Sequence, residues 1–265
     1  MLELSLIIAF LVLLVASITD IKKREVPDWL SFSFIAVAFI IAVSKSVIYS
    51  DFSFILKSLL GFAVFFIIAS LFYFGKLFAG ADAKLLIGMG ALSGIDFSFL
   101  ANLLIIGGFY GLIYAAVLAS LNFKKTKHEI KKIKIPLLPF FIIFIFSLIT
   151  AILFKSIIFY FTAFLAVFSP LLYAFAFAVE KAALIRLVKP EKITEGDWLA
   201  NDITIKGKTI KATFEGLSKS DIKLIRKAKK PVIIKYGLPF VPIFLIAFLA
   251  EIIFGNLLFR TLGML

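Results

Sequence analysis

Two aspartates lie at the borders of apolar segments, where a carboxylate is costly and therefore a candidate for function. Asp82 lies in the small-residue run from Leu77 to Leu86, and Asp20 follows the first apolar segment of the chain. By insertion scales, a charged aspartate at the centre of a membrane helix costs about 2.5–3.5 kcal/mol. Plainer interpretations are open as well. Asp82 could cap the helix that follows it, and Asp20 could be a solvated charge beside lysines.

If the two carboxyl groups meet, they can hydrolyse a peptide bond. Two close carboxylates cannot both ionise cheaply, so they share one proton and titrate as a unit. The ionised member takes a proton from water, and the protonated member polarises a peptide carbonyl, as in aspartic proteases. This chemistry needs no metal and no cofactor, and we expect none. It also suits a chain with no cysteine and only one histidine, His128.

The elements that must position these aspartates are membrane helices. The chain has 265 residues, of which 62% are hydrophobic and 33 are phenylalanine, a composition typical of a polytopic membrane protein. A full membrane span needs about 20 residues. The fourth segment is too short and is expected to be a partial helix that opens at Asp82. The predicted apolar segments are Leu4–Thr19, Trp29–Val43, Phe54–Phe74, Ala83–Leu92, Phe97–Leu121, Ile135–Phe154, Ser156–Leu187 and Leu238–Phe259.

The basic residues predict the orientation of the chain in a cell membrane. With the N-terminus outside, 25 of the 29 lysines and arginines fall on the cytoplasmic side. Both aspartates then lie at the cytoplasmic edge. The lysine-rich connection after Leu121 lacks interleaved aromatic residues, so we expect it to meet membrane lipid rather than nucleic acid.

A small polar insert interrupts the apolar pattern. Residues 202–214 alternate apolar and polar side chains around Gly207, which predicts a hairpin. Ser218 and Asp221 resemble a capping box that precedes a helix. We therefore expect an all-α polytopic membrane protein with about seven or eight apolar segments and a small cytoplasmic α+β insert. The predicted domains are a transmembrane domain over 1–188, the insert over 189–235 and a C-terminal membrane helix over 236–265.

Several of these stretches together resemble one family. Asp20 to Leu30, with its basic run and Val26-Pro27, looks like the first motif of type IV prepilin peptidases. Gly80-Ala81-Asp82 resembles their second motif, in the GxGD class of membrane aspartyl proteases, although alanines stand at the two glycine positions. Lys235 to Pro242 and Glu195 to Leu199 are similar to segments of archaeal members, which include the preflagellin peptidases.

The resemblance implies an aspartic-type endopeptidase with Asp20 and Asp82 as its catalytic residues. Such an enzyme cleaves short basic leader peptides from prepilin-like or archaellin precursors at the cytoplasmic membrane face. Bacterial members that also methylate carry an insert with paired cysteines. This chain has no cysteine, so we expect a peptidase without methylase activity.

Other functions remain open on the sequence alone. A proton- or cation-coupled transporter could use the same aspartates, although transporter sites usually lie near the membrane midplane in repeated halves. A non-enzymatic assembly scaffold is a third alternative. Glu251 is an unusual charge within the last apolar segment, where it could pair with Arg260 or with a neighbouring helix. Lys84 could tune the two aspartates, but it is more simply an anchor at the membrane surface.

Overall fold

The chain forms two compact units in the computed structural model, which describes residues 2–155, 157–205, 207–213 and 216–257. Unit 1 comprises Met1–Gly111 together with Gly237–Leu265, and unit 2 comprises Leu112–Tyr236. Helix α5 (Ser98–Leu121) contains the boundary between them. Both predicted catalytic aspartates belong to unit 1.

Unit 1 is helical. It contains α1 (Leu2–Lys23), α2 (Asp28–Tyr49), α3 (Ser53–Phe74), α4 (Gly80–Ser93), the first part of α5, and α10 (Val241–Phe254). Within the described ranges, six helices of the chain are long and apolar enough to cross a membrane: α1, α2, α3, α5, α7 and α8. The prediction of a polytopic helical membrane protein is therefore confirmed.

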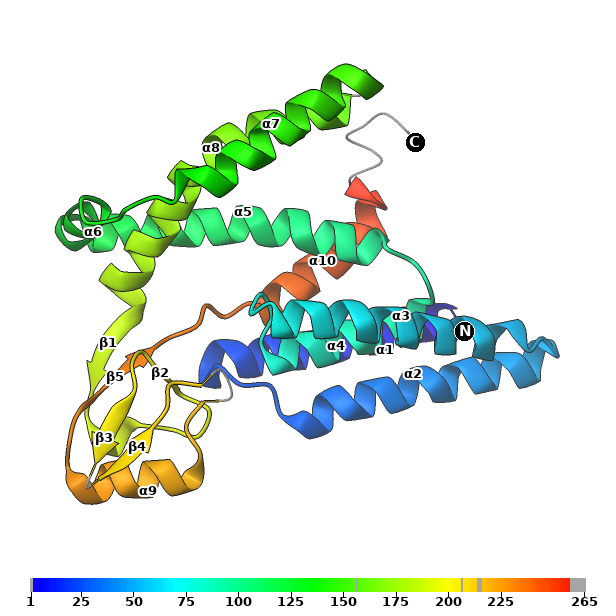
Figure 1. The fold of residues 1–265 in the computed structure, drawn as a ribbon. Coiled ribbons are helices and arrows are strands. Elements are labelled where there is room, and N and C mark those ends of the chain that lie inside the picture. Colours follow the sequence, from blue (N-terminus) through cyan, green and yellow to red (C-terminus); the bar gives the residue numbers. More distant parts are fainter. Residues whose placement is uncertain (1, 156, 206, 214–215, 258–265) are drawn as a thin grey trace. The chain divides into compact units, whose positions relative to one another are not determined.

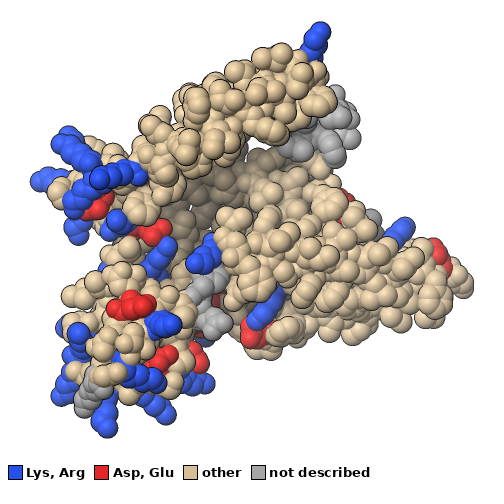
Figure 2. Space-filling model, in the orientation of Figure 1, with Lys and Arg blue, Asp and Glu red and all other residues tan. Residues whose placement is uncertain are grey.

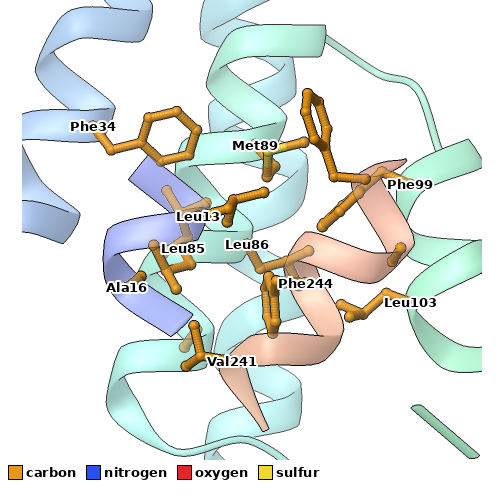
Figure 3. Close-up of a cluster of buried hydrophobic side chains, with 14 of the residues drawn as sticks. Leu13, Ala16, Phe34, Leu85, Leu86, Met89, Phe99, Leu103, Val241 and Phe244 are labelled. Carbon is orange, nitrogen blue, oxygen red and sulfur yellow. The ribbon is translucent and has the colours of Figure 1, made fainter. Parts of the chain in front are cut away.

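Helix α4 is the central element of unit 1. It packs against α2 and α3, while α1 packs against α10. Nine of its residues are buried, from Asp82 to Ala91, although only 14 residues form the helix. Leu85, Leu86 and Met89 contribute to the core drawn in Figure 3, together with Leu13 of α1 and Phe244 of α10. A helix enclosed on all sides can hold a carboxylate away from both lipid and bulk water.

Unit 2 combines a helical part with a small sheet. Its helices are α6 (Phe123–Ile130), α7 (Leu137–Phe154) and α8 (Ile157–Val179), of which α7 and α8 pack side by side (Figure 1). A three-stranded antiparallel sheet has the order β1 (Ile185–Val188), β5 (Val232–Lys235), β2 (Trp198–Leu199). Lysine and arginine side chains gather over α6 and over the insert, whereas the surface of α7 and α8 is almost free of charge (Figure 2).

The local predictions for the insert are confirmed. Strands β3 (Ile203–Ile205) and β4 (Lys208–Ile210) form a hairpin, and Gly207 in its turn has the positive φ of +80° that favours glycine. Ser218 accepts a hydrogen bond from the backbone N–H of Asp221 at the start of α9 (Lys219–Ala228). Ile222 and Ile225 of this helix face a second hydrophobic core.

The structure departs from the predicted segments at several places: α2 continues to Tyr49, beyond the predicted end at Val43, and α4 begins at Gly80 rather than at Asp82. The seventh segment was expected to run to Leu187, but α8 ends at Val179. A short π-helical turn, Glu180–Leu184, follows it, and Ile185–Val188 forms strand β1, which pairs with β5. The lysine-rich connection after Leu121 forms the short helix α6, which carries His128. The last apolar segment forms a helix only from Val241, because prolines at 239 and 242 restrict where it can begin. Residues 258 and 259 of that segment lie outside the described ranges.

Candidate active site

Asp20 lies in the last turn of α1 and is 7% exposed. Its Oδ2 accepts a hydrogen bond of 3.0 Å from the backbone N–H of Val241, the first residue of α10. The N-terminus of a helix carries a partial positive charge and stabilises a nearby carboxylate. The first turn of α10 thus compensates part of the cost of burying Asp20.

Asp82 also accepts a hydrogen bond from a backbone N–H at the start of a helix, in this case α4. It is the third residue of α4, and its side chain is 6% exposed. Its Oδ2 accepts a hydrogen bond of 2.9 Å from the backbone N–H of Ala79, the residue that caps the helix. The capping interpretation of Asp82 is therefore correct for one of its two oxygens. Within the described ranges, Oδ1 of neither aspartate accepts a hydrogen bond, which leaves one oxygen of each for other partners.

The two carboxyl groups act on each other. The negative charge of Asp20 repels that of Asp82, although 61 residues separate them in the sequence. The guanidinium of Arg24, one turn after Asp20, attracts the Asp20 carboxylate. The two aspartates therefore lie within electrostatic reach of each other, inside unit 1.

Buried aromatic side chains lie next in sequence to both backbone donors. Phe78 is 4% exposed, and its ring lies 5.6 Å from that of Phe240 and 6.0 Å from that of Phe244. Phe78 directly precedes Ala79, Phe240 directly precedes Val241, and Phe244 lies in the first turn of α10, so these rings lie close to the backbone groups that bind the carboxyls. Low polarity strengthens the interaction between two charges. Burial of the two carboxyls therefore favours one shared proton over two full negative charges.

The short segment that leads into α10, Gly237–Val241, is called the strap here and is held by three hydrogen bonds. Arg24 Nη1 donates a hydrogen bond of 3.0 Å to the carbonyl oxygen of Gly237. The hydroxyl of Tyr110 donates one of 3.0 Å to the carbonyl oxygen of Pro239. The third hydrogen bond runs from the backbone N–H of Val241 to Oδ2 of Asp20. Arg24 and Tyr110 were not recognised as site residues from the sequence, where the only signal was the motif from Lys235 to Pro242.

Two residues near the aspartates, Lys84 and Gly80, have well-defined surroundings. The Lys84 ammonium forms an ion pair of 2.6 Å with Asp28 and lies 5.0 Å from the centre of the Phe32 ring, both on α2. These contacts join α4 to α2, which the sequence did not predict. At Gly80, an added Cβ would approach no atom closer than 3.8 Å, so the structure has room for a side chain there.

Comparison with known proteins gives a consistent assignment for this region. Residues 7–116 match the type IV leader peptidase family, and this range includes both Asp20 and Asp82. The N-terminal part of this protein is therefore similar to type IV leader peptidases. Three curated preflagellin peptidases are similar to it, from Methanococcus maripaludis (33% identical over 86 residues), Methanococcus voltae (38% over 85) and Methanocaldococcus jannaschii (36% over 90).

These similarities have a limited extent. The aligned segments cover 32–34% of this chain and 36–38% of the length of the three relatives. No solved structure matches the chain. Val241 and the rest of the strap lie outside the family match, as do all the residues of the sheet.

Proposed function

We propose that this protein is a membrane aspartyl endopeptidase that removes short basic leader peptides from prepilin-like or archaellin precursors. The observation that carries the proposal is the pair of buried carboxyls, Asp20 and Asp82, whose charges interact. The similarity to preflagellin peptidases over the region that contains both residues supports the same reaction class. We further propose that the two aspartates face the cytoplasm, as the distribution of basic residues predicts.

The environment of each carboxyl suggests its role. Burial favours the protonated form of both carboxyls. At Asp20 the Val241 N–H and the Arg24 guanidinium oppose this effect, whereas at Asp82 the Ala79 N–H opposes it and the negative charge of Asp20 adds to it. We therefore assign the ionised role to Asp20 and the protonated role to Asp82. Asp20 would take a proton from water as the water oxygen attacks the scissile carbonyl carbon. Asp82 would donate its proton to the carbonyl oxygen. The tetrahedral gem-diol then collapses: one of its hydroxyls returns a proton to the Asp82 carboxylate, the C–N bond breaks, and the leaving nitrogen takes the proton held by Asp20, which restores both carboxyls. One water is consumed, and the products are a leader carboxylate and a new N-terminus.

The arrangement of backbone donors fits this assignment. Each Oδ2 is fixed by a backbone N–H at the start of a helix, so the two carboxyls are oriented before substrate arrives. Preorganised groups of this kind lower the barrier because they need not reorganise during the reaction. Both aspartates lie near helix ends and not in the middle of a long span, which favours a protease that meets its substrate at the membrane surface over a transporter.

Cleavage of a leader-bearing precursor tests this proposal. The purified full-length protein would be mixed in detergent with an archaellin-like precursor, and the products would be identified by mass spectrometry. We expect one cut between the leader and the apolar segment, unchanged by a chelator or by a thiol-blocking reagent. A protein that never cleaves the precursor but moves protons across vesicle membranes would contradict the proposal and support the transporter alternative.

A further inference from the structure

A cavity of about 520 Å³ lies in unit 1, away from the two aspartates. Ser5 and Ser93 line it. On α1, Ser5 lies 15 residues before Asp20, which is about 22 Å along the helix axis. On α4, Ser93 lies 11 residues after Asp82, which is about 16 Å along that helix axis. The cavity is therefore at the opposite ends of these two helices and forms a separate site.

Four charged side chains surround the cavity. Lys45 lies near the end of α2, Lys57 near the start of α3, Asp96 in the connection after α4, and Glu251 near the end of α10. Within the described ranges, none of the four forms an ion pair. The Lys45 ammonium donates a hydrogen bond of 3.1 Å to the Ser5 hydroxyl. Asp96 accepts one of 2.8 Å from the backbone N–H of Ser98.

Burial disfavours the ionised form of Glu251, and the charge of the nearby Asp96 carboxylate adds to this effect, so a cationic group in the cavity would stabilise both carboxylates. Two ammonium groups and two carboxylates therefore face one space without neutralising one another by contact. A ligand that carries one charge of each sign could pair with both sets. An ion of a single sign would leave the other set without a partner.

Apart from Ser5, Ser58, Ser93 and Gly94, the rest of the lining is apolar. It includes side chains of α1, α2, α4 and α10, among them Leu6, Ile41, Met89, Phe248 and Ile252. Pockets of this size and character suit an amphiphilic molecule, since most of their surface excludes water and a few polar groups fix the orientation. The charged residues lie at helix ends, where the head groups of a bilayer meet a membrane protein.

We propose that this cavity binds a zwitterionic phospholipid, whose head group carries a phosphate and an amine. Lys45 and Lys57 bind the phosphate, Asp96 and Glu251 bind the ammonium, and the apolar lining holds the first methylenes of the chains. The site explains why a glutamate occurs in the apolar helix α10, where an unpaired charge is costly. The proposal does not depend on proteolysis, because it concerns the opposite ends of the helices.

Thermal unfolding with added lipid tests the site. The purified full-length protein in detergent would be titrated with short-chain phosphatidylethanolamine, and its unfolding midpoint followed. A ligand that binds the native state raises the midpoint as its concentration passes the dissociation constant. We expect such a rise, and we expect the double variant Lys45→Gln with Lys57→Gln to bind about tenfold more weakly or worse. Glu251→Gln should weaken binding as well and leave cleavage in detergent unchanged.

Lys76→Gln is the matched control, because Lys76 lies in the turn after α3, at the other end of that helix from Lys57. It should bind the lipid like the natural protein. If the double variant does not fold, the single variant Lys57→Gln is tested for lipid binding instead. It should fold, because the Lys57 side chain is exposed. Equal binding of phosphatidylglycerol, which has no amine, would overturn the proposal. Equal binding of glycerophosphoethanolamine or inorganic phosphate, which have no acyl chains, would also overturn it. Lipid binding that none of the variants weakens would overturn it as well.

Discussion

Asp20 accepts a hydrogen bond from the backbone N–H of Val241, a residue 221 positions further along the chain. The bond joins the end of the first helix to the start of the last. It also means that the surroundings of Asp20 depend on a segment outside the part of the chain that matches the type IV leader peptidase family. A protease that retained only residues 7–116 would lose this contact.

Tyr110 should act as a positioning residue for Asp20. Its hydroxyl fixes the carbonyl of Pro239, two residues before Val241. Tyr110→Phe keeps the ring and removes one hydrogen bond, worth on the order of 1 kcal/mol, so we expect kcat to fall by about three- to tenfold. KM should change little, and the pH profile of kcat should shift because the Val241 bond to Asp20 is less well held.

Tyr160→Phe is the control for this change, since Tyr160 is an exposed residue of α8. It should cleave like the natural protein. An unchanged kcat and pH profile for Tyr110→Phe would show that the strap needs no such support. Because the comparison is made within an active enzyme, this result would leave the protease assignment itself intact.

Gly61→Ala should destabilise unit 1 strongly. Helices α3 and α4 approach so closely that an added Cβ at Gly61 would lie 2.6 Å from the Cα of Gly94 and closer still to the carbonyl oxygen of Gly90. Both are backbone atoms that cannot rotate away, so the helices must separate. We expect a loss of about 1–3 kcal/mol or more in the free energy of unfolding.

Gly108→Ala provides the comparison, because a Cβ at this position of α5 would meet no atom within 4 Å. Alanine also has the higher helix propensity, so stability should stay equal or rise slightly. The measurement is thermal unfolding in detergent for both variants. Equal midpoints for Gly61→Ala and the natural protein would contradict the close packing of α3 on α4.

Sequence patterns predicted the features that depend on neighbouring residues. Long apolar runs located the membrane helices, Gly207 located a hairpin turn, and Ser218 with Asp221 located the start of α9. The cost of a carboxylate at a membrane border singled out Asp20 and Asp82. Each of these signals is contained within about twenty residues, which is why a single sequence could reveal it.

Features that depend on distant residues were not predicted. Ile185–Val188 continues the apolar run of α8, and only its pairing with β5, almost fifty residues later, makes it a strand. The Tyr110 hydroxyl and the Val241 amide have no local pattern that marks them as part of a site. The cavity charges, from Lys45 to Glu251, come together only through the packing of α1, α2, α3, α4 and α10.

The predicted orientation can be tested with single cysteines, because the natural chain has none. Cysteines that replace Lys23, Lys127 or Lys208 should not react with an impermeant thiol reagent added to intact cells. A cysteine that replaces Lys155, in the connection after α7, should react. This pattern follows from the excess of basic residues on the cytoplasmic side. Labelling at position 127 from outside would reverse the proposed orientation.

The catalytic assignment predicts that Asp20 and Asp82 work as one unit. Each change to Asn should reduce cleavage to background, and the double change should be little worse than either, because the effects of residues that act together are not additive. Changes to Glu should also be poor, since a misplacement of about 1 Å can cost roughly a hundredfold in rate. His128→Ala and Asp51→Asn are matched controls, and both should retain cleavage.

Cleavage of a leader-bearing precursor by purified Asp82→Asn is the most direct test of this account. Asn keeps the shape of the side chain and removes its proton donor, so the protein should still insert and fold, with an unfolding midpoint close to that of the natural protein. We predict that the natural protein releases the leader and that Asp82→Asn does not, over the full range of pH at which the natural protein is active. Near-normal release of the leader by a folded Asp82→Asn would contradict the account.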